Sequence, residues 1–493
     1  MVEQDLLAIA PLVAALLVAS AIIVADLIRP GSRTPPLVVA LVGLAIVALV
    51  VAWTGRSPGT AFGGSYQVDA LTTFLDLLFV AIIGFTLLFA PDYLEVRGLP
   101  LAEFAAVLVF AMTGAMLISG SADLLVLFIG LELMVLPGYL LAGYAKRDAL
   151  STEGAIKYFL LGSFSSAIFL FGLAFVWGLT GSTKIAVVSD QLAAIVAGTA
   201  PLSAGLAMGL AFLTAGVAFK IAAVPFHYWT PDAYQGSPTP VTGYLSVGPK
   251  IGAFALILRL FVGALGSLHA DWLIVIVVLS TITMTLGNLV AITQDNVKRM
   301  LAYSSIAHTG YMLVGLAAWA SDGGPEARSD GLEGLLFYGA AYSFMNLGAF
   351  AVVAALQRRR GVTSGIDTFA GLARREPALA ILMTLFLLSL TGIPPTAGFF
   401  AKAFVILAGV EAGGPAGLLA VIAVLNAAVA AFYYLRVVVY MFMRDGTGDP
   451  IPVPKSGIMR AGLASTAFLT LAIGLYPEPL VKAVEQAAAA LVF

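Results

Sequence analysis

Long apolar runs separated by short polar stretches follow one another along almost the whole chain. A helix of about 20 mostly apolar residues is long enough to cross the hydrocarbon core of a bilayer. Hydropathy places fourteen such stretches, at about 6–28, 35–54, 69–90, 102–120, 122–144, 152–178, 202–224, 239–264, 271–292, 299–319, 332–356, 378–408, 416–442 and 461–481. Only 11% of the 493 residues are charged, whereas soluble globular chains carry roughly 25%. The sequence therefore predicts an all-α polytopic membrane protein with about 14 transmembrane helices.

The composition also excludes several kinds of site. Without cysteine, the chain cannot form disulfides, thiolate-ligated zinc sites or protein-held iron–sulfur clusters. Three histidines leave little for haem or a multi-histidine metal site, and a net charge of −2 without a basic run argues against nucleic acid as a partner. We therefore expect no cofactor and no metal in this chain, and the lipid bilayer as its surroundings.

Basic residues are distributed unevenly between the predicted loops. If both termini share one side, the loops of the opposite face hold fifteen: Arg29, Arg33, Arg97, Lys146, Arg147, Lys298, Arg299, Arg358, Arg359, Arg360, Arg374, Arg375, Arg444, Lys455 and Arg460. The other face holds four, at Arg56, Lys184, Arg328 and Lys482. Because basic loops remain in the cytoplasm, we predict a multi-pass protein of the cell (inner) membrane with both termini on the outer, periplasmic side.

Five charged residues lie deeper in the predicted spans, namely Glu132, Lys157, Lys220, Lys250 and Lys402. Each central charge costs about 2.5–3.5 kcal/mol, so a functional role is favoured over a structural one. Two alternatives stay open: Lys157 is close enough to its span end to reach the cytoplasm, and Glu132 could be a counter-ion alone. Arg259 and Arg436 lie nearer to span ends, where we expect their side chains to extend to the surface.

Glu132 and Lys157 are predicted to form a pair. The turn between their helices falls near Ala145, about 13 residues from one and 12 from the other. Antiparallel helices that rise by the same amount per residue place both side chains at similar depth. Opening and closing such a pair would change the affinity of neighbouring groups for protons.

Two spans contain the same string beside helix-breaking residues. Thr214–Lys220 and Thr396–Lys402 both read Thr-Ala-Gly, three further residues and Lys, 182 residues and five spans apart. Pro225 follows the first string, and Gly392 to Pro395 precede the second. We therefore expect discontinuous seventh and twelfth helices and, because five is odd, two repeats of opposite orientation. Interrupted helices with ions near the membrane midplane are typical of ion-coupled transporters.

The buried groups suit protons better than metal cations. The sequence shows no evident carboxylate cage for sodium, and a charged lysine cannot ligate a cation. A lysine removed from water holds its proton less firmly and can exchange it. His308 is either a relay member or a satisfied interhelical histidine, and Asp69 and Asp76 are expected to be interfacial. A row of lysines joined by water, serine and histidine would conduct protons along the membrane.

These residues resemble the antiporter-like membrane subunits of respiratory complex I, the proton-pumping NADH:quinone oxidoreductase, and most closely its N subunits. The resemblance covers nearly the whole chain and is carried by Leu131-Glu132-Leu133 with Tyr139, by residues 153–159 around Lys157, by Phe219-Lys220 through 225–242, and by Thr391-Gly392-Ile393-Pro394-Pro395 with Lys402. Residues 229–236 match the N subunits specifically. The M subunits differ there and typically carry glutamate in place of Lys402, and the L subunits are longer.

The resemblance implies fourteen helices, with inverted repeats formed by the fourth to eighth and ninth to thirteenth. It divides the chain into an N-terminal three-helix segment (1–101), two five-helix repeats (102–264 and 265–442) and a C-terminal helix and tail (443–493). It implies a coupling pair at Glu132 and Lys157, central lysines at Lys220 and Lys250, and an exit-side lysine at Lys402. NAD, FMN, iron–sulfur clusters and quinone are expected in partner subunits, and other membrane-arm subunits are the expected partners.

Three other functions remain to be distinguished. A subunit of a multisubunit monovalent cation/proton antiporter would share the fold and the lysines. A free-standing secondary transporter would act alone and hold a substrate at the broken helices. A structural scaffold would leave the buried lysines unexplained. Proton pumping that requires NADH would favour the complex I subunit.

Overall fold

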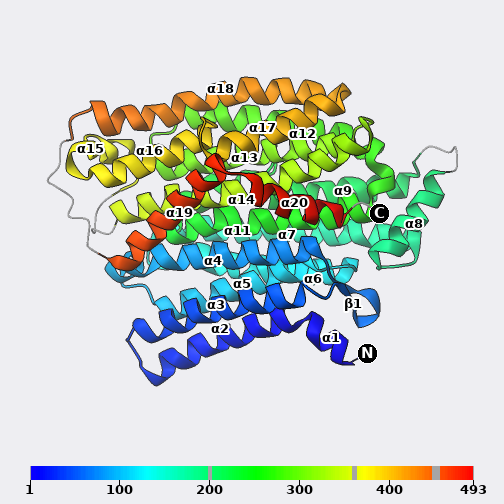
Figure 1. Cartoon of the computed structure of the whole chain (residues 1–493), viewed down its shortest axis with the longest axis horizontal. Coiled ribbons are helices and arrows are strands. Elements are labelled where there is room, and N and C mark those ends of the chain that lie inside the picture. Colours follow the sequence, from blue (N-terminus) through cyan, green and yellow to red (C-terminus); the bar gives the residue numbers. More distant parts are fainter. Residues whose placement is uncertain (1, 198–201, 358–362, 447–455, 492–493) are drawn as a thin grey trace.

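The computed structural model describes residues 2–197, 202–357, 363–446 and 456–491 and consists almost entirely of helices (Figure 1). Among these residues, eleven helices are long and apolar enough to cross a membrane. They are α2 (Ala10–Ile28), α3 (Thr34–Thr54), α4 (Ala70–Arg97), α5 (Leu101–Ser119), α6 (Leu124–Ala142), α7 (Ala149–Thr180), α11 with η2 (Thr239–Ala264), η3 with α12 (Gly266–Ile292), α14 (Gly324–Leu356), α18 (Gly414–Met443) and α19 (Gly457–Leu475). The predicted helical, polytopic membrane architecture is therefore confirmed.

Two of the predicted spans are interrupted, as their proline and glycine residues indicated. In the first, predicted at 202–224, the helix α9 (Ala204–Lys220) ends at Lys220, and the short α10 (Trp229–Gly236) follows beyond the predicted bound. The second consists of α16 (Pro377–Thr391) and α17 (Ala397–Ala412). The repeated strings lie differently, however: Thr214–Lys220 precedes its interruption, whereas Thr396–Lys402 follows its own. The string match therefore does not mark equivalent positions, and it gives the predicted repeat no support.

Short elements that hydropathy did not predict lie mainly at helix ends. They are α1 (Val2–Ala8), the antiparallel strands β1 (Gly59–Ala61) and β2 (Tyr66–Val68) with η1 (Phe62–Gly64) between them, α8 (Ile185–Val196), η4 (Ile366–Phe369) and α15 (Leu372–Arg375). The predicted last span ends early, because Pro477 separates α19 from α20 (Glu478–Ala489). Such elements are too short to produce a hydropathy signal of membrane length.

The centre of the bundle is formed by α11, α14 and α13 (Val297–Ala320). Every residue of α11 and nearly all of α14 and α13 is buried, whereas α2, α3, α7 and α18 expose apolar side chains. Helices α2 to α6 lie on one side of this centre, and α12 and α16 to α18 on the other (Figure 1). Lys250 on α11 and His308 on α13 are consequently enclosed by protein, whereas charged residues near the helix ends, such as Arg299, are partly exposed.

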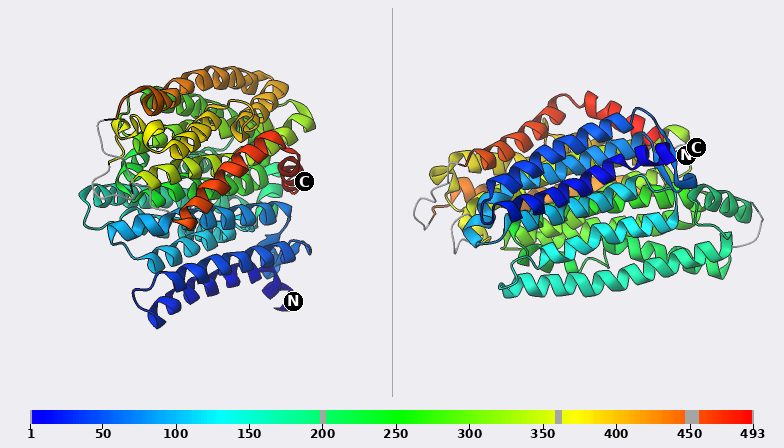
Figure 2. Two further views of the ribbon diagram at one scale, coloured as in Figure 1. Left: turned by 60° about the vertical axis from the view of Figure 1, so that its left-hand side comes forward. Right: turned by 90° about the horizontal axis from the view of Figure 1, so that it is seen from below.

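Both described ends of the chain lie at one end of the bundle, which we name the terminal end (Figure 1 and Figure 2). The β1–β2 hairpin and α8 lie there too. The hairpin is tied to the α5–α6 connection, since Gln67 N donates to Gly120 O (2.7 Å) and Ala122 N to Ser65 O (3.0 Å). Arg358, Arg359, Arg360 and Lys455, counted above among the basic loops, lie outside the described residues.

Candidate functional site

Lys220 is the last residue of α9 and lies at the interruption of that span. Its Nζ donates to Ser166 Oγ of α7 (2.7 Å), and the residue is only 7% exposed. Backbone groups freed by the interruption find partners on neighbouring helices: Thr309 donates to Ile221 O (2.7 Å), and Val224 N donates to Thr283 Oγ1 (3.0 Å). Irregular backbone at membrane depth is tolerated only with such partners.

Lys250 lies midway along α11 and is 3% exposed. Its Nζ donates to both Ser305 Oγ (2.7 Å) and the Ser305 carbonyl on α13. The Tyr342 ring of α14 lies 5.6 Å from the same Nζ. The ammonium group is therefore held by neutral oxygen atoms and an aromatic face.

His308 follows Ser305 by one helical turn on α13 and is fully enclosed. Its Nδ1 forms a hydrogen bond with the Tyr338 hydroxyl (2.6 Å), and its Nε2 forms one with the Tyr434 hydroxyl (3.2 Å). The Tyr342 ring lies 4.9 Å from the imidazole ring. Because both ring nitrogens contact a hydroxyl, which can donate or accept, either imidazole tautomer is accommodated.

Lys402 lies in the second turn of α17 and is 6% exposed. Its Nζ donates to the carbonyls of Leu390 (3.0 Å) and Thr391 (2.7 Å) at the end of α16, and lies 4.9 Å from the Tyr311 ring. Gly392 has φ +95°, and a Cβ atom there would come within 2.9 Å of Lys402 Cδ. Glycine at this interruption therefore gives the lysine room to reach the free carbonyls of α16.

These residues form what we name the central row: Lys220, Lys250, His308 and Lys402. In the described part of the chain, no carboxylate forms an ion pair with its three lysines. Electrostatic interactions link His308 to both Lys250 and Lys402. Buried polar atoms without a hydrogen-bond partner among the described residues include Glu132 Oε1, Tyr139 OH, Tyr342 OH and Asn346 Oδ1. Groups of this kind normally bind internal water.

The predicted Glu132–Lys157 pair is wrong. Lys157 Nζ contacts Glu153 Oε1 and Asp232 Oδ2, each at 2.6 Å, and its side chain is 41% exposed. Glu132 Oε1 has no hydrogen-bond partner among the described residues, and its carboxylate interacts electrostatically with Lys220 instead. Equal depth fixes one coordinate of each side chain but not the directions in which they point, so the depth argument could not establish contact.

Lys157 belongs instead to a charged network at the end of the bundle opposite the termini. Asp232 of α10 accepts from Lys157 through one oxygen and from Arg299 Nη1 through the other (2.6 Å). Arg299 also donates to Gln235 Oε1 (3.1 Å). The network joins α7, α10 and the start of α13. It agrees with the alternative in which Lys157 lies close enough to the end of its span for the side chain to reach the surface.

Two basic residues that the sequence placed in a loop or near the surface are buried in the structure. Lys298, expected in a loop, is buried and donates to the backbone carbonyls of Gln235 (3.1 Å) and Ser237 (2.5 Å). Arg259, expected to extend to the surface, is also buried and forms an ion pair with Asp69 (2.8 Å). Distance from a predicted span end is a poor guide to burial where neighbouring helices extend further.

No group of three or more histidine, cysteine, aspartate or glutamate side chains able to hold a metal ion occurs among the described residues. The absence of a cofactor from this chain remains a prediction.

Comparison with known proteins identifies relatives over nearly the full length of the chain. Residues 121–427 match the family described as NADH:quinone oxidoreductase/Mrp antiporter, TM. NADH-quinone oxidoreductase subunit N of Chloroflexus aggregans is 39% identical over 98% of this chain and 97% of its own. A chain of respiratory complex I from Thermus thermophilus is 30% identical, with a TM-score of 0.77 over 96% of this chain and 98% of that one.

A chain of the Mrp complex from Dietzia sp. has the same fold, with a TM-score of 0.80 over 100% of this chain and 98% of that one, at 22% identity. Such low identity shows the fold alone. The relation to the N subunits is closer, because it combines high coverage with much higher identity. The chain therefore belongs to the NADH:quinone oxidoreductase/Mrp antiporter family of membrane subunits, and within it to the N subunits of NADH-quinone oxidoreductase.

Proposed function

We propose that this chain translocates protons across the membrane as a subunit of NADH-quinone oxidoreductase, and that the protons pass along the central row. The observation that carries the proposal is the set of partners around Lys220, Lys250 and Lys402. An ammonium group held by hydroxyls and carbonyls in a protein interior can lose its proton without leaving an unpaired carboxylate behind. A lysine bound to carboxylates lacks this freedom.

His308 would connect Lys250 on α11 with Lys402 on α17. Its ring nitrogens contact Tyr338 and Tyr434, and Ser305 lies one turn away at Lys250. A neutral imidazole carries one donor and one acceptor nitrogen, so it can accept a proton at one nitrogen and release one from the other. Internal water bound to the orphan atoms near Tyr342 and Asn346 would complete the connection.

Glu132 would couple the row to the rest of the enzyme. Its carboxylate acts electrostatically on Lys220 without touching it, so a change in its charge or position alters how firmly Lys220 holds a proton. This role replaces the pairing with Lys157. Lys157 would instead hold α10 to α7 through Asp232.

The finer organisation also belongs to the proposal. We infer fourteen crossings, formed by the eleven long helices, α13 and the two interrupted spans, within the segments 1–101, 102–264, 265–442 and 443–493. The terminal end would face the outside of the cell (inner) membrane, since most loop bases lie at the opposite end. Neighbouring membrane-arm subunits would be the partners, with NAD, FMN, iron–sulfur clusters and quinone held by other subunits.

The test is NADH-driven proton pumping by the whole enzyme in sealed vesicles. Lys220→Ala and Glu132→Ala should each reduce pumping by about tenfold or more, because positioned proton-transfer groups contribute at least that much. Lys184→Ala is the matched control, since Lys184 is exposed and donates to Gly63 O at the terminal end. Full pumping in both variants would contradict the proposal. Sodium-dependent exchange without NADH would favour the antiporter-subunit alternative.

A further inference from the structure

A second cluster of buried polar groups lies at the terminal end and takes no part in the central row. Arg259 belongs to η2 (Leu258–Ala264), the π-helical continuation of α11. Its Nη1 contacts Asp69 Oδ2 and its Nη2 donates to Asp69 Oδ1, both at 2.8 Å, while Nε donates to Ser119 O (2.8 Å). Burial alone would raise the pKa of Asp69, but Arg259 and the Thr72 N–H hold that pKa below its ordinary value. The pair is therefore a fixed, ionised element.

Asp76 lies two turns into α4, beside this pair, and is 1% exposed. Its Oδ1 lies 2.5 Å from Ser119 Oγ. The charged and titratable groups that act on it come from three elements: Tyr66 of β2, Asp69 before α4 and Arg259 of η2. The Tyr66 ring packs against Gly120, where a Cβ atom would come within 2.4 Å of it.

The hydrogen bonds of Ser119 define two protonation states for Asp76. Ser119 Oγ lies 2.5 Å from Asp76 Oδ1 and 2.8 Å from Met116 O. A hydroxyl has one proton to donate. When Asp76 is ionised, Ser119 donates to it; when Asp76 is protonated, Asp76 donates to Ser119, and Ser119 donates to Met116 O. Both states are hydrogen-bonded without moving a heavy atom.

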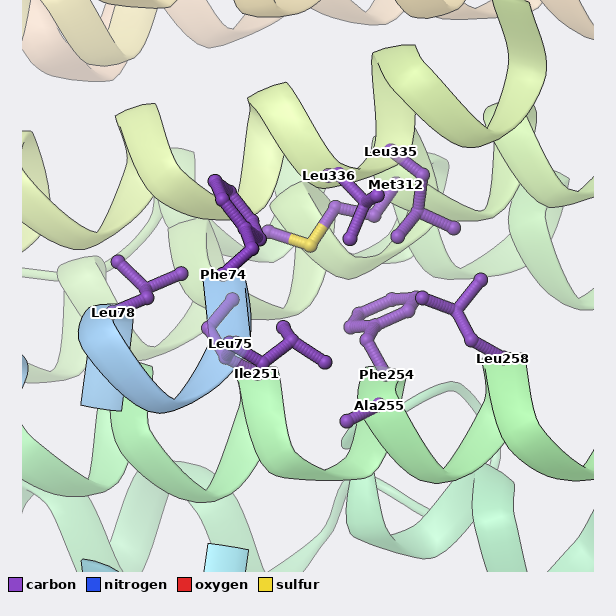
Figure 3. A pocket seen from close by; sticks show the side chains of 11 residues that line it. Phe74, Leu75, Leu78, Ile251, Phe254, Ala255, Leu258, Met312, Leu335 and Leu336 are labelled. Carbon is purple, nitrogen blue, oxygen red and sulfur yellow. The ribbon is translucent and has the colours of Figure 1, made fainter. Parts of the chain in front are cut away.

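An apolar cavity is lined by residues of α4, α11 with η2, α13 and α14 (Figure 3). On α11 and η2 its lining runs from Ile251 to Leu258, which lie between Lys250 and Arg259 in the sequence. On α4 it consists of Phe74, Leu75 and Leu78, on the helix face that points away from Asp76. Apolar constrictions of this kind block proton movement when dry and permit it when water enters. The cavity therefore lies between α11, the helix of Lys250, and α4, the helix of Asp76.

We propose that Asp76 is a proton-holding residue which, with Ser119 and the Asp69–Arg259 pair, forms the site where protons pass between the central row and the terminal face. The proposal rests on the proposed function. An O–H bond forms at Asp76 as an O–H bond of a protonated water on the Lys250 side breaks and leaves neutral water. The O–H bond at Asp76 then breaks as the proton moves to a water on the Asp69 side, which carries it away as hydronium. Asp69 and Arg259 act on the Asp76 carboxyl group in opposite senses, so the pair fixes the electrostatic surroundings in which Asp76 exchanges its proton.

Asp76→Asn tests this role, because the amide keeps the shape and the hydrogen bond to Ser119 but cannot exchange a proton. In the whole enzyme, NADH-driven pumping should fall by about tenfold or more, and Asp76→Glu should restore most of it. Infrared difference spectra should contain the carbonyl stretch of a protonated carboxyl group that Asp76→Asn removes and Ser119→Ala shifts. Asp190→Asn, at an exposed position on α8, is the matched control and should change neither.

Normal pumping by assembled Asp76→Asn enzyme would overturn the proposal, as would a carbonyl band unaffected by both substitutions. If Asp76→Asn fails to assemble, the band in the native and Ser119→Ala enzymes decides in the same way. Lys250→Ala distinguishes a failure of the proposed Asp76 site from a failure of the proposed function of the central row. If Lys250→Ala loses pumping while Asp76→Asn pumps normally, only the role of Asp76 is contradicted. If both variants pump normally, the proposed function itself is contradicted.

Discussion

Lys157 and Lys250 are both lysines within predicted membrane spans, yet their surroundings differ in kind. Lys157 contacts two carboxylates, Glu153 and Asp232, and its side chain is 41% exposed. Lys250 is 3% exposed and contacts a hydroxyl, a carbonyl and an aromatic ring. The first environment stabilises a permanent positive charge, whereas the second gives that charge no counter-ion.

The difference separates two uses of lysine in one membrane protein. Lys157 joins α7 to α10 through an ion pair near the end of the bundle, as a structural residue would. Lys250 and Lys402 remain hydrogen-bonded in the middle of the bundle whether or not they carry a proton. In the proposed function, burial with neutral partners, rather than position within a span, distinguishes the lysines that transfer protons.

Lys250→Ala should have the largest effect. It removes a proton-exchanging group between Lys220 and His308 and leaves Ser305 without its partner, so NADH-driven pumping should fall by about a hundredfold. The amount of this chain in the purified enzyme should be unchanged and serves as the control. Pumping at the native rate would mean that the central row does not carry protons.

Lys402 offers a substitution that changes the charge but keeps a titratable group. Lys402→Ala should reduce pumping by about tenfold or more, whereas Lys402→Glu should lose less, since a carboxyl group can also accept and release a proton. The comparison is made in vesicles at equal enzyme content. Equal losses in the two variants would count against a relay role and in favour of a structural one.

Lys157→Ala should have the smallest effect. The pair with Asp232 is partly exposed, and exposed ion pairs contribute little to stability because solvent screens them. Arg299 remains to hold Asp232. We expect pumping close to native and a slightly lower temperature of unfolding for the assembled enzyme. Loss of pumping as severe as that of Lys250→Ala would remove the distinction between the two lysines.

The sequence was most informative where the membrane itself imposes the pattern. Apolar length predicted the eleven membrane-length helices found among the described residues, and proline and glycine indicated both interruptions, because these features follow from local backbone chemistry. Lys220, Lys250 and Lys402, whose charges are costly within a membrane span, are buried inside the protein, as their positions within the spans predicted.

Contacts between helices could not be predicted in this way. Equal depth suggested a Glu132–Lys157 pair that does not form, since helix rotation and lateral position were unknown. Arg259 was placed at the surface because the hairpin and the α5–α6 connection that bury it lie in loops without hydropathy signal. Lys298 was missed because its carbonyl partners lie on α10 and on Ser237 directly after it, and α10 is too short to be recognised as a membrane helix.

The most direct test compares Lys250→Arg with Lys157→Arg in NADH-driven proton pumping. Arginine keeps the positive charge and the hydrogen-bond donors of lysine but does not lose its proton in proteins. We predict that Lys250→Arg abolishes pumping, whereas Lys157→Arg, which still bridges Glu153 and Asp232, pumps at a rate close to native. Native pumping by Lys250→Arg would show that the buried charge suffices without proton exchange, and would contradict the account.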